Sequence, residues 1–482
     1  MAQSFTEFFC DASGGSNINA GDKTANGVVT STNGDWDNAT ANRFTAAAGT
    51  PFSGVSVGDF ASVYLDGATL AVYIARVTAV NGGGASLDLS TTAISGTKPT
   101  AGATGRSCTT GGAWKGPNGT ETFPSAFITA ALTNSSTHPP RVNFKNGTSY
   151  DVTTPMTFTQ SGPLKFQGYT STPGDGGRAV FRGPASGASI NILSSSNTDC
   201  HFEDMEITRN GDSGTTAAVS FLQTECLAKR LVVHDVYASG FSATAAITLV
   251  ECEAYACVTG NGTNSAGFFT SGAGSHLIRC IAHDNTGSNV AGFRSGGTVI
   301  RHTGCIAESN GANGFEWSTT TNPGSYLNCD SYNNGGAGFS LVATTTVAGA
   351  FYLENCNILK NTLWGVDTGT TNKVTGVIIN CGFGSGTQAN GSGTIHTGTG
   401  WMVEDSGTIT YAADTTPWVD PANGDFRINL TAAKGTGRGA FLQTAASYAG
   451  AVAYPDVGAC QHQETGGGGG SSRLIGNPGI IL

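Results

Sequence analysis

The sequence predicts an all-β solenoid, in which short strands are wound into stacked coils. Three observations predict it: abundant glycine, few charged residues, and a residue pattern that recurs every 22 to 28 positions. The 482 residues include 71 Gly and only 12% charged residues. Gly is interleaved with Thr, Ser, Asn, Val and Phe, which favours many short strands and tight turns over long helices. A period of this length is typical of units that bury their apolar face only by stacking.

The recurring pattern has three columns: a Cys, then an Asn, then a Gly-Phe pair. The predicted Cys column is Cys200, Cys226, Cys252, Cys280, Cys305, Cys329, Cys356 and Cys381. The Gly-Phe column is Phe241, Phe268, Phe293, Phe315 and Phe339, followed by Val366, and the Asn column is Asn285, Asn310, Asn334 and Asn361. Equivalent residues of stacked coils lie about 4.8 Å apart. We therefore expect the Cys and Phe columns inside, and the Asn column bonding coil to coil at a bend where a non-Gly residue adopts the left-handed region.

The twelve cysteines are predicted to be reduced thiols. The chain starts Met-Ala-Gln-Ser-Phe-Thr-Glu, without the basic and apolar regions of a secretory signal. We therefore expect synthesis in a host cytoplasm without the usual export, where disulfides are rare. Regular spacing also favours Cys as a small apolar core residue, so Cys280, Cys305, Cys329 and Cys356 are predicted to be buried, stacked and reduced.

Strand alternation supports the same fold and carries a resemblance to a known family. Ile278, Cys280 and Ala282 are predicted to point inward, with the residues between them outward. With the three columns, this resembles the right-handed parallel β-helix repeat family from about residue 141 to 463. The segment 8–19 resembles the opening strand of such domains, and 420–427 and 455–459 resemble their closing turns.

The resemblance divides the chain into five parts. These are a first strand at 1–24, an inserted small β-barrel or sandwich at 25–108, an N-terminal cap with a short helix at 109–140, the parallel β-helix at 141–463, and a linker with an apolar tail at 464–482. Strands of the insertion are predicted at 57–60, 71–80 and 85–89, and the helix of the cap at 123–132.

Charge and motifs exclude several function classes. The net charge is −10 and no run of Lys or Arg occurs, which argues against nucleic acid and anionic membranes as partners. No stretch of about 18 apolar residues occurs. The calcium-binding nonapeptide repeat, Cys-x-x-Cys metal pairs and phosphate-binding Gly loops are absent, so the sequence indicates neither metal nor cofactor.

Two carboxylates are the candidate catalytic pair. Glu308 belongs to the outward ladder of Tyr255, His283, Glu308 and Tyr332, and Asp330 lies on the next coil, two positions before Tyr332. Their backbones would be roughly 8 Å apart, within the range of an inverting glycosidase, with Glu308 as acid and Asp330 as base. Alternatively, neighbouring coils of an acidic solenoid pair two carboxylates by chance, and then no catalysis occurs here.

A candidate carbohydrate-binding surface follows the Gly-Phe corner. Arg294, Glu316 and Trp317 lie on neighbouring coils, and an exposed Trp would stack on a sugar ring. Tyr332 and His283 on the outward ladder are further candidates. The alternative is an ordinary ion pair between Arg294 and Glu316.

The end of the chain is predicted to dock on another subunit. Five glycines at 466–470 form a flexible linker. The tail beyond it holds five large aliphatic residues, Leu474, Ile475, Ile480, Ile481 and Leu482. Soluble monomers avoid exposing such a segment, so we expect a homo-oligomer, most simply a trimer, or attachment to a particle shell.

Two functions compete. The first is a virion structural protein, a phage tailspike, fibre or capsid-decorating protein, that presents a rigid β-helix to host surface polysaccharide and contacts other virion proteins. The second is a polysaccharide lyase or glycoside hydrolase on the same fold. A free enzyme needs export and a compelling acid/base set, and neither is evident, so the sequence favours the virion protein and leaves enzymatic activity open.

Overall fold

The computed structural model describes residues 5–16, 20, 28–37, 42–66, 73–100, 102–116, 139–158, 162–258, 265–287, 289–317, 324–341, 350–368, 375–384, 395–396, 403–406, 409–411 and 416–429. The predicted helix at 123–132 and the predicted tail at 464–482 lie outside these residues. Two compact units form: Met1–Pro184 with Ile192–Ile207, and Ala185–Asn191 with Thr208–Leu482. Across the described part of the chain, no helix is long and apolar enough to cross a membrane.

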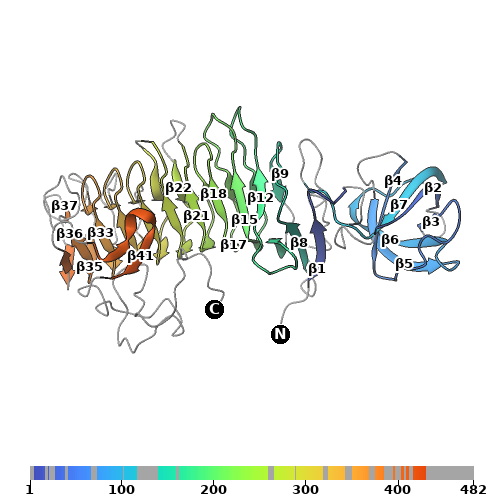
Figure 1. Cartoon of the computed structure of the whole chain (residues 1–482). Coiled ribbons are helices and arrows are strands. Elements are labelled where there is room, and N and C mark those ends of the chain that lie inside the picture. Colours follow the sequence, from blue (N-terminus) through green and yellow to red (C-terminus); the bar gives the residue numbers. More distant parts are fainter. Residues whose placement is uncertain are drawn as a thin grey trace. The chain divides into compact units, whose positions relative to one another are not determined.

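The chain is a right-handed parallel β-helix, built from three parallel sheets over the described residues (Figure 1). The twelve-stranded sheet holds β1 (Thr6–Cys10), β8 (Pro140–Lys145), β11 (Leu164–Tyr169), β14 (Cys200–Glu203), β17 (Cys226–Lys229), β20 (Ile247–Val250), β23 (His276–Ile278), β26 (Arg301–Thr303), β29 (Ser325–Leu327), β32 (Ala350–Glu354), β35 (Thr375–Ile379) and β38 (Val403–Ser406). The eleven-stranded sheet holds β9 (Tyr150–Asp151), β12 (Ala179–Arg182), β15 (Met205–Thr208), β18 (Val232–His234), β21 (Glu253–Tyr255), β24 (Ile281–His283), β27 (Ile306–Glu308), β30 (Asp330–Tyr332), β33 (Asn357–Leu359), β36 (Gly382–Gly384) and β39 (Ile409–Tyr411). The ten-stranded sheet holds β10 (Met156–Phe158), β13 (Leu193–Ser195), β16 (Val219–Phe221), β19 (Phe241–Ala243), β22 (Ala266–Thr270), β25 (Ala291–Ser295), β28 (Phe315–Trp317), β31 (Phe339–Ser340), β34 (Val366–Asp367) and β37 (Ile395–His396).

The predicted Phe column lies in the ten-stranded sheet and is confirmed. Phe241 pairs with Phe268, and the pairing continues coil by coil to Val366. Phe293 and Phe315 stack with ring centroids 4.8 Å apart, and Phe315 and Phe339 stack at 4.6 Å. These rings are buried. The column therefore forms a continuous aromatic stack along the solenoid interior.

The predicted Asn column also bonds coil to coil. Asn285 Nδ2 donates to Asn310 Oδ1 at 2.7 Å, and Asn310 and Asn334 each repeat the bond to the next member at 2.8 Å. The glycines that directly precede the Phe column make room for these amides. A Cβ on Gly314, for example, would lie 2.8 Å from Asn334 Nδ2. Gly therefore precedes Phe because of this close approach.

The sequence predicts that the Asn residues themselves adopt the left-handed bend, and this prediction is wrong. The bend falls one residue earlier, at Asp284, Ser309, Asn333 and Lys360, with φ between 50° and 54°. The bend turns the chain just before the Asn, whose side chain is buried. A second column of left-handed residues, including Arg279, Asn328 and Asn355, precedes the inward Cys residues.

The Cys column begins later than predicted. Cys200 and Cys226 start strands of the twelve-stranded sheet, where they pair with Leu164 and Ile247. The inward column that follows the left-handed corner is Cys252, Cys280, Cys305, Cys329, Cys356 and Cys381, which we call the thiol column. Leu231 occupies the equivalent position on the coil before Cys252. The Leu231 carbonyl accepts a hydrogen bond from the Glu253 amide, just as the Cys252 carbonyl accepts one from the Ile281 amide. The cysteines have similar spacing along the sequence, although Cys200 and Cys226 occupy a different position in the coil from the later six.

All eleven cysteines among the described residues are buried and free, including Cys280, Cys305, Cys329 and Cys356. We expect a thiol reagent to react with most of the twelve cysteines in denaturant without reductant, and with few in the native protein, because burial blocks access. Spectrophotometric titration measures both numbers. Recovery of almost no thiols in denaturant would show that disulfides are present and contradict the structure.

A buried histidine replaces an apolar residue in the twelve-stranded sheet. His302 lies between Leu277 and Tyr326 on neighbouring strands, with its ring 4.8 Å from the Tyr326 ring. Neither ring nitrogen has a hydrogen-bond partner among the described residues. Burial lowers the pKa of His302 to about 4, so the imidazole stays neutral at ordinary pH.

This low pKa predicts acid sensitivity. Above pH 6.5 both folded and unfolded states hold a neutral His302, and ionisation has no effect on stability. Between pH 6.5 and 4 only the unfolded state binds the proton, so about 3 kcal/mol of stability is lost. We expect His302→Leu, which copies Leu277, to reduce this loss in urea titrations at several pH values. Equal pH slopes for both proteins would contradict the assignment.

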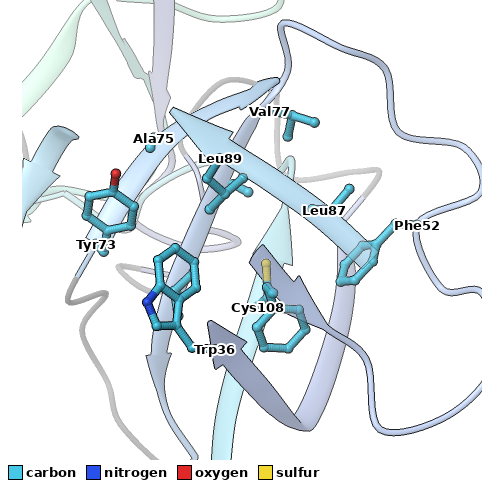
Figure 2. Close-up of a cluster of buried hydrophobic side chains, with 11 residues drawn as sticks. Trp36, Phe52, Tyr73, Ala75, Val77, Leu87, Leu89 and Cys108 are labelled. Atoms are coloured by element: carbon cyan, nitrogen blue, oxygen red, sulfur yellow. The ribbon is translucent and has the colours of Figure 1, made fainter. Parts of the chain in front are cut away.

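The segment after β1 forms a closed antiparallel barrel in the order β2-β3-β6-β5-β4-β7. Its strands are β2 (Val29–Asp37), β3 (Arg43–Thr45), β4 (Phe60–Leu65), β5 (Tyr73–Asn81), β6 (Ser86–Gly96) and β7 (Ala103–Thr110). Figure 2 shows Trp36, Phe52, Tyr73 and Cys108 gathered in its interior. Closure leaves no sheet edge open for pairing with other chains.

One predicted barrel strand is displaced. The strand expected at 57–60 begins only at Phe60, because Ser56 and Asp59 close a turn through two hydrogen bonds and Gly58 has φ 100°. Strands β2, β3 and β7 had not been predicted. Their alternation is interrupted by Gly and polar residues, as in β2, where the register shifts between Ser31 and Gly34.

Candidate functional site

The predicted outward ladder exists on the eleven-stranded sheet. His234, Tyr255, His283, Glu308 and Tyr332 occupy equivalent positions on successive coils. The His234 and Tyr255 rings stack at 4.8 Å, and the Tyr255 and His283 rings stack at 4.9 Å. We call these five residues the outer ladder.

His283 lies at the centre of the best-organised polar group on this face. Its Nε2 is 2.9 Å from Glu253 Oε1, and its Nδ1 is 2.8 Å from Asp284 Oδ2. Glu253 is buried, whereas the Asp284 side chain is 65% exposed. Burial alone would lower the pKa of His283, but the hydrogen bonds and charges of Glu253 and Asp284 outweigh it and raise the pKa. The imidazole therefore retains a proton to higher pH than a free histidine.

The same His-Asp pairing occurs two coils earlier. His234 Nδ1 lies 2.8 Å from Asp235 Oδ2, and the Asp235 side chain is 63% exposed. In both pairs the aspartate has a left-handed backbone. The repeated His-Asp dipeptide is visible in the sequence, and it could have identified Asp284 as the partner of His283.

Glu308 and Asp330 are not directly opposite each other. Glu308 pairs with Tyr332, and Asp330 pairs with Ile306, so the pair has the two-residue offset that the sequence predicted. However, Asp330 is fully buried, whereas Glu308 is half-buried. Only one of the two carboxylates lies at the surface.

A hairpin from later in the chain covers Asp330. Strands β40 (Trp418–Asp420) and β41 (Asp425–Ile428), joined by the 3-10 helix η3 (Pro421–Asn423), pack on Tyr332 of the outer ladder and on its neighbours Ile306 and Leu359. Trp418 Nε1 donates to Asp330 Oδ2 at 3.3 Å, and Trp418 contacts Tyr332 edge to face. Tyr332 is 7% exposed. The expectation that Asp330 and Tyr332 face solvent is wrong, because the hairpin buries their outward side.

The second predicted surface is also closed. Arg294 and Glu316 are neighbours in the ten-stranded sheet and form an ion pair with two contacts of 3.0 Å. Trp317 is only 1% exposed and shares its strand's inward alternation with Phe315. The exposed Trp that we had expected is therefore buried, whereas the alternative of an Arg294–Glu316 ion pair is confirmed.

No family model and no curated protein matches the sequence. A pectate lyase structure has a TM-score of 0.39 at 16% identity and covers 69% of this chain and 90% of its own. A rhamnogalacturonan lyase has a TM-score of 0.34 at 14% identity, covering 60% and 88%. ORF18 of Geobacillus virus E2 has a TM-score of 0.35 at 16% identity, covering 58% of this chain and 55% of its own.

The structural neighbours are mostly polysaccharide lyases, epimerases and glycosidases, together with the viral protein. At these identities and scores, the likeness carries no information about activity. Among the described residues, no group of three or more His, Cys, Asp or Glu side chains could hold a metal ion.

Proposed function

We propose that the chain is a structural protein of a virion surface, a tailspike, fibre or capsid-decorating protein, whose rigid coils face host glycans. The observation that carries the proposal is how the charged groups of the outer faces are used. Arg294 binds Glu316, His283 binds Glu253, and Asp330 lies beneath Trp418. Each contact joins one coil to another or to the hairpin. Such contacts stiffen a shaft, whereas catalytic carboxylates must reach a substrate.

Localisation and binding test this proposal together. Antibodies raised against the purified protein should label particles released by lysis of cells that carry the gene, in immunogold electron microscopy. The protein should also bind polysaccharide from the cell surface without shortening it, as measured by size-exclusion chromatography of the glycan. Absence from particles, together with secretion of the protein by intact cells, would refute the virion role.

The apolar tail gives the proposal a second test, because we propose that it attaches the chain to a neighbouring subunit. We compare the full chain with one ending at Thr465, and with a variant in which Leu474, Ile475, Ile480, Ile481 and Leu482 are all Ser. Light scattering should show loss of the oligomer in both altered chains, while circular dichroism and melting temperature stay unchanged. Equal assembly of all three chains would remove the tail from the interface.

A depolymerase is the second candidate, and the arrangement around His283 favours it. The imidazole is held between a buried and an exposed carboxylate, and its raised pKa suits a general acid. Glu308 follows it in the outer ladder and is half-buried. Glu308, rather than the buried Asp330, is the carboxylate within reach of a glycan, and His283, which is 6% exposed, lies next to it in the ladder.

Activity assays distinguish the two candidates. Lyase activity appears as absorbance of unsaturated products, and hydrolase activity appears as new reducing ends. If the protein is a depolymerase at this face, His283→Gln and Glu308→Gln should each lower the rate at least 100-fold, while Asp235→Asn leaves it unchanged. Activity that survives both substitutions would exclude this face, and no activity on the glycan that the protein binds would favour the structural role.

A further inference from the structure

The thiol column places six cysteines in one line through the second unit. Its register is set by the backbone: the amide of Ile306 donates to the carbonyl of Cys280, and the amide of Asp330 donates to that of Cys305, both at 2.9 Å. The same bond recurs between the coils of Cys252, Cys329 and Cys356 and their successors. All six side chains are at most 1% exposed. The column is thus a repeated, fully enclosed arrangement of soft sulfur ligands.

Successive sulfurs of the column are neighbours along the axis. Burial raises the pKa of the Cys280 thiol, and the adjacent thiols of Cys252 and Cys305 raise it further. Each sulfur also points toward a backbone carbonyl of the preceding coil, as Cys305 Sγ does toward Leu277 O at 3.4 Å. The sulfurs therefore lie along the coil axis rather than turning away from it.

The spacing of the coils suits a cation with two ligands. A bond between a thiolate sulfur and a d10 cation such as Zn²⁺ is about 2.3 Å long, so two such bonds in line span about 4.6 Å. Neighbouring parallel strands are about 4.8 Å apart. A tetrahedral ion such as Zn²⁺ needs four ligands, and no set of three or more His, Cys, Asp or Glu is arranged for a metal in the described residues. Linear coordination between two coils fits, whereas higher coordination does not.

The net charge of the bound site favours a divalent over a monovalent metal cation. A divalent cation with two thiolates is neutral, whereas a monovalent cation leaves a net negative charge. An uncompensated charge is costly in an interior lined by side chains such as Leu277, Ala282 and Phe315. We propose that the thiol column is a site for soft divalent d10 cations of the mercury(II) type, each held linearly by two thiolates from neighbouring coils. On binding, two S–H bonds break, two S–metal bonds form, and two protons leave to solvent without oxidation or reduction.

Two triple variants with equal cysteine content test adjacency. The alternating variant, Cys280→Ala with Cys329→Ala and Cys381→Ala, leaves no two neighbours in the column. The contiguous variant, Cys252→Ala with Cys280→Ala and Cys305→Ala, leaves three neighbours. Each full-length chain is refolded with mercuric chloride, washed with glutathione to remove singly bound metal, checked by circular dichroism, and weighed by native mass spectrometry.

We expect the contiguous variant to retain one more mercury per chain than the alternating variant, with the mass of two protons lost, and the natural chain to retain more than either. The complementary alternating variant, Cys252→Ala with Cys305→Ala and Cys356→Ala, replaces the first if that one does not fold, and the same result is expected. Equal retention by contiguous and alternating variants, or no retention by the natural chain, overturns the proposal. Loss of two protons without mercury also overturns it, because the column would then form disulfides.

Discussion

Replacing Asn334 with alanine is expected to lower the free energy of unfolding by about 3 to 5 kcal/mol. Its amide group donates to Asn361 Oδ1 at 2.8 Å and to Ala307 O at 3.1 Å, and its Oδ1 accepts from the backbone and side chain of Asn310. Removing it leaves several buried polar groups without partners, each costing about 1–3 kcal/mol. Denaturant unfolding measures the loss, and hydrogen exchange of neighbouring amides shows which coils open.

Asn289→Ala is the matched control, because Asn289 is exposed. We expect this variant to change the free energy of unfolding by less than about 0.5 kcal/mol. A loss at Asn334 no larger than at Asn289 would mean that the amide column does not contribute to stability. An increase in exchange limited to the coils of Asn310, Asn334 and Asn361 would fit the nearest-neighbour coupling of a solenoid.

Phe315→Ala is expected to cost about 3 to 5 kcal/mol, as large deletions in a packed core do. The ring is fully buried, stacks on Phe293 and Phe339, and meets Tyr326 edge to face. Its removal opens a cavity that rigid parallel strands on both sides cannot collapse to fill. Calorimetry and denaturant unfolding measure the effect.

Phe269 provides the control, since it points outward next to the inward Phe268 and is half-buried. Phe269→Ala should cost clearly less than Phe315→Ala, because part of that ring is already in water. Equal losses would show that the inward and outward faces of β22 are assigned wrongly.

The inward columns could be predicted because coil stacking converts a period in sequence into a line in space. The Phe and Asn columns needed only this relation, and the structure confirms both. Cys200 and Cys226 could not be placed this way. A step of about 26 residues separates equivalent positions on successive coils, whichever corner those positions occupy. The spacing therefore does not show which strand a residue belongs to, because the lengths of the corners vary.

The surroundings of the site could not be predicted, because they depend on contacts outside the repeat. Asp330 and Trp418 are 88 residues apart, and the hairpin that joins them does not share the period. Alternation correctly directed Asp330 outward, but it contains no information on what packs there. Trp317 was misjudged for a simpler reason: the alternation that buries Phe315 also buries the residue two positions later.

The parallel register also has a consequence for how the chain folds. Paired residues such as Phe293 and Phe315 are separated by 22 positions, so most pairings give a relative contact order of about 0.05, below that of helical bundles and far below that of β-sandwiches. Strand β1 is the exception, since Thr6 pairs with Pro140 only after the barrel and its flanking segments have been made. Closing that long loop costs more entropy than closing any coil. Coils of the second unit can thus nucleate anywhere and propagate, whereas β1 is expected to join last, as a slow kinetic phase set by the insertion.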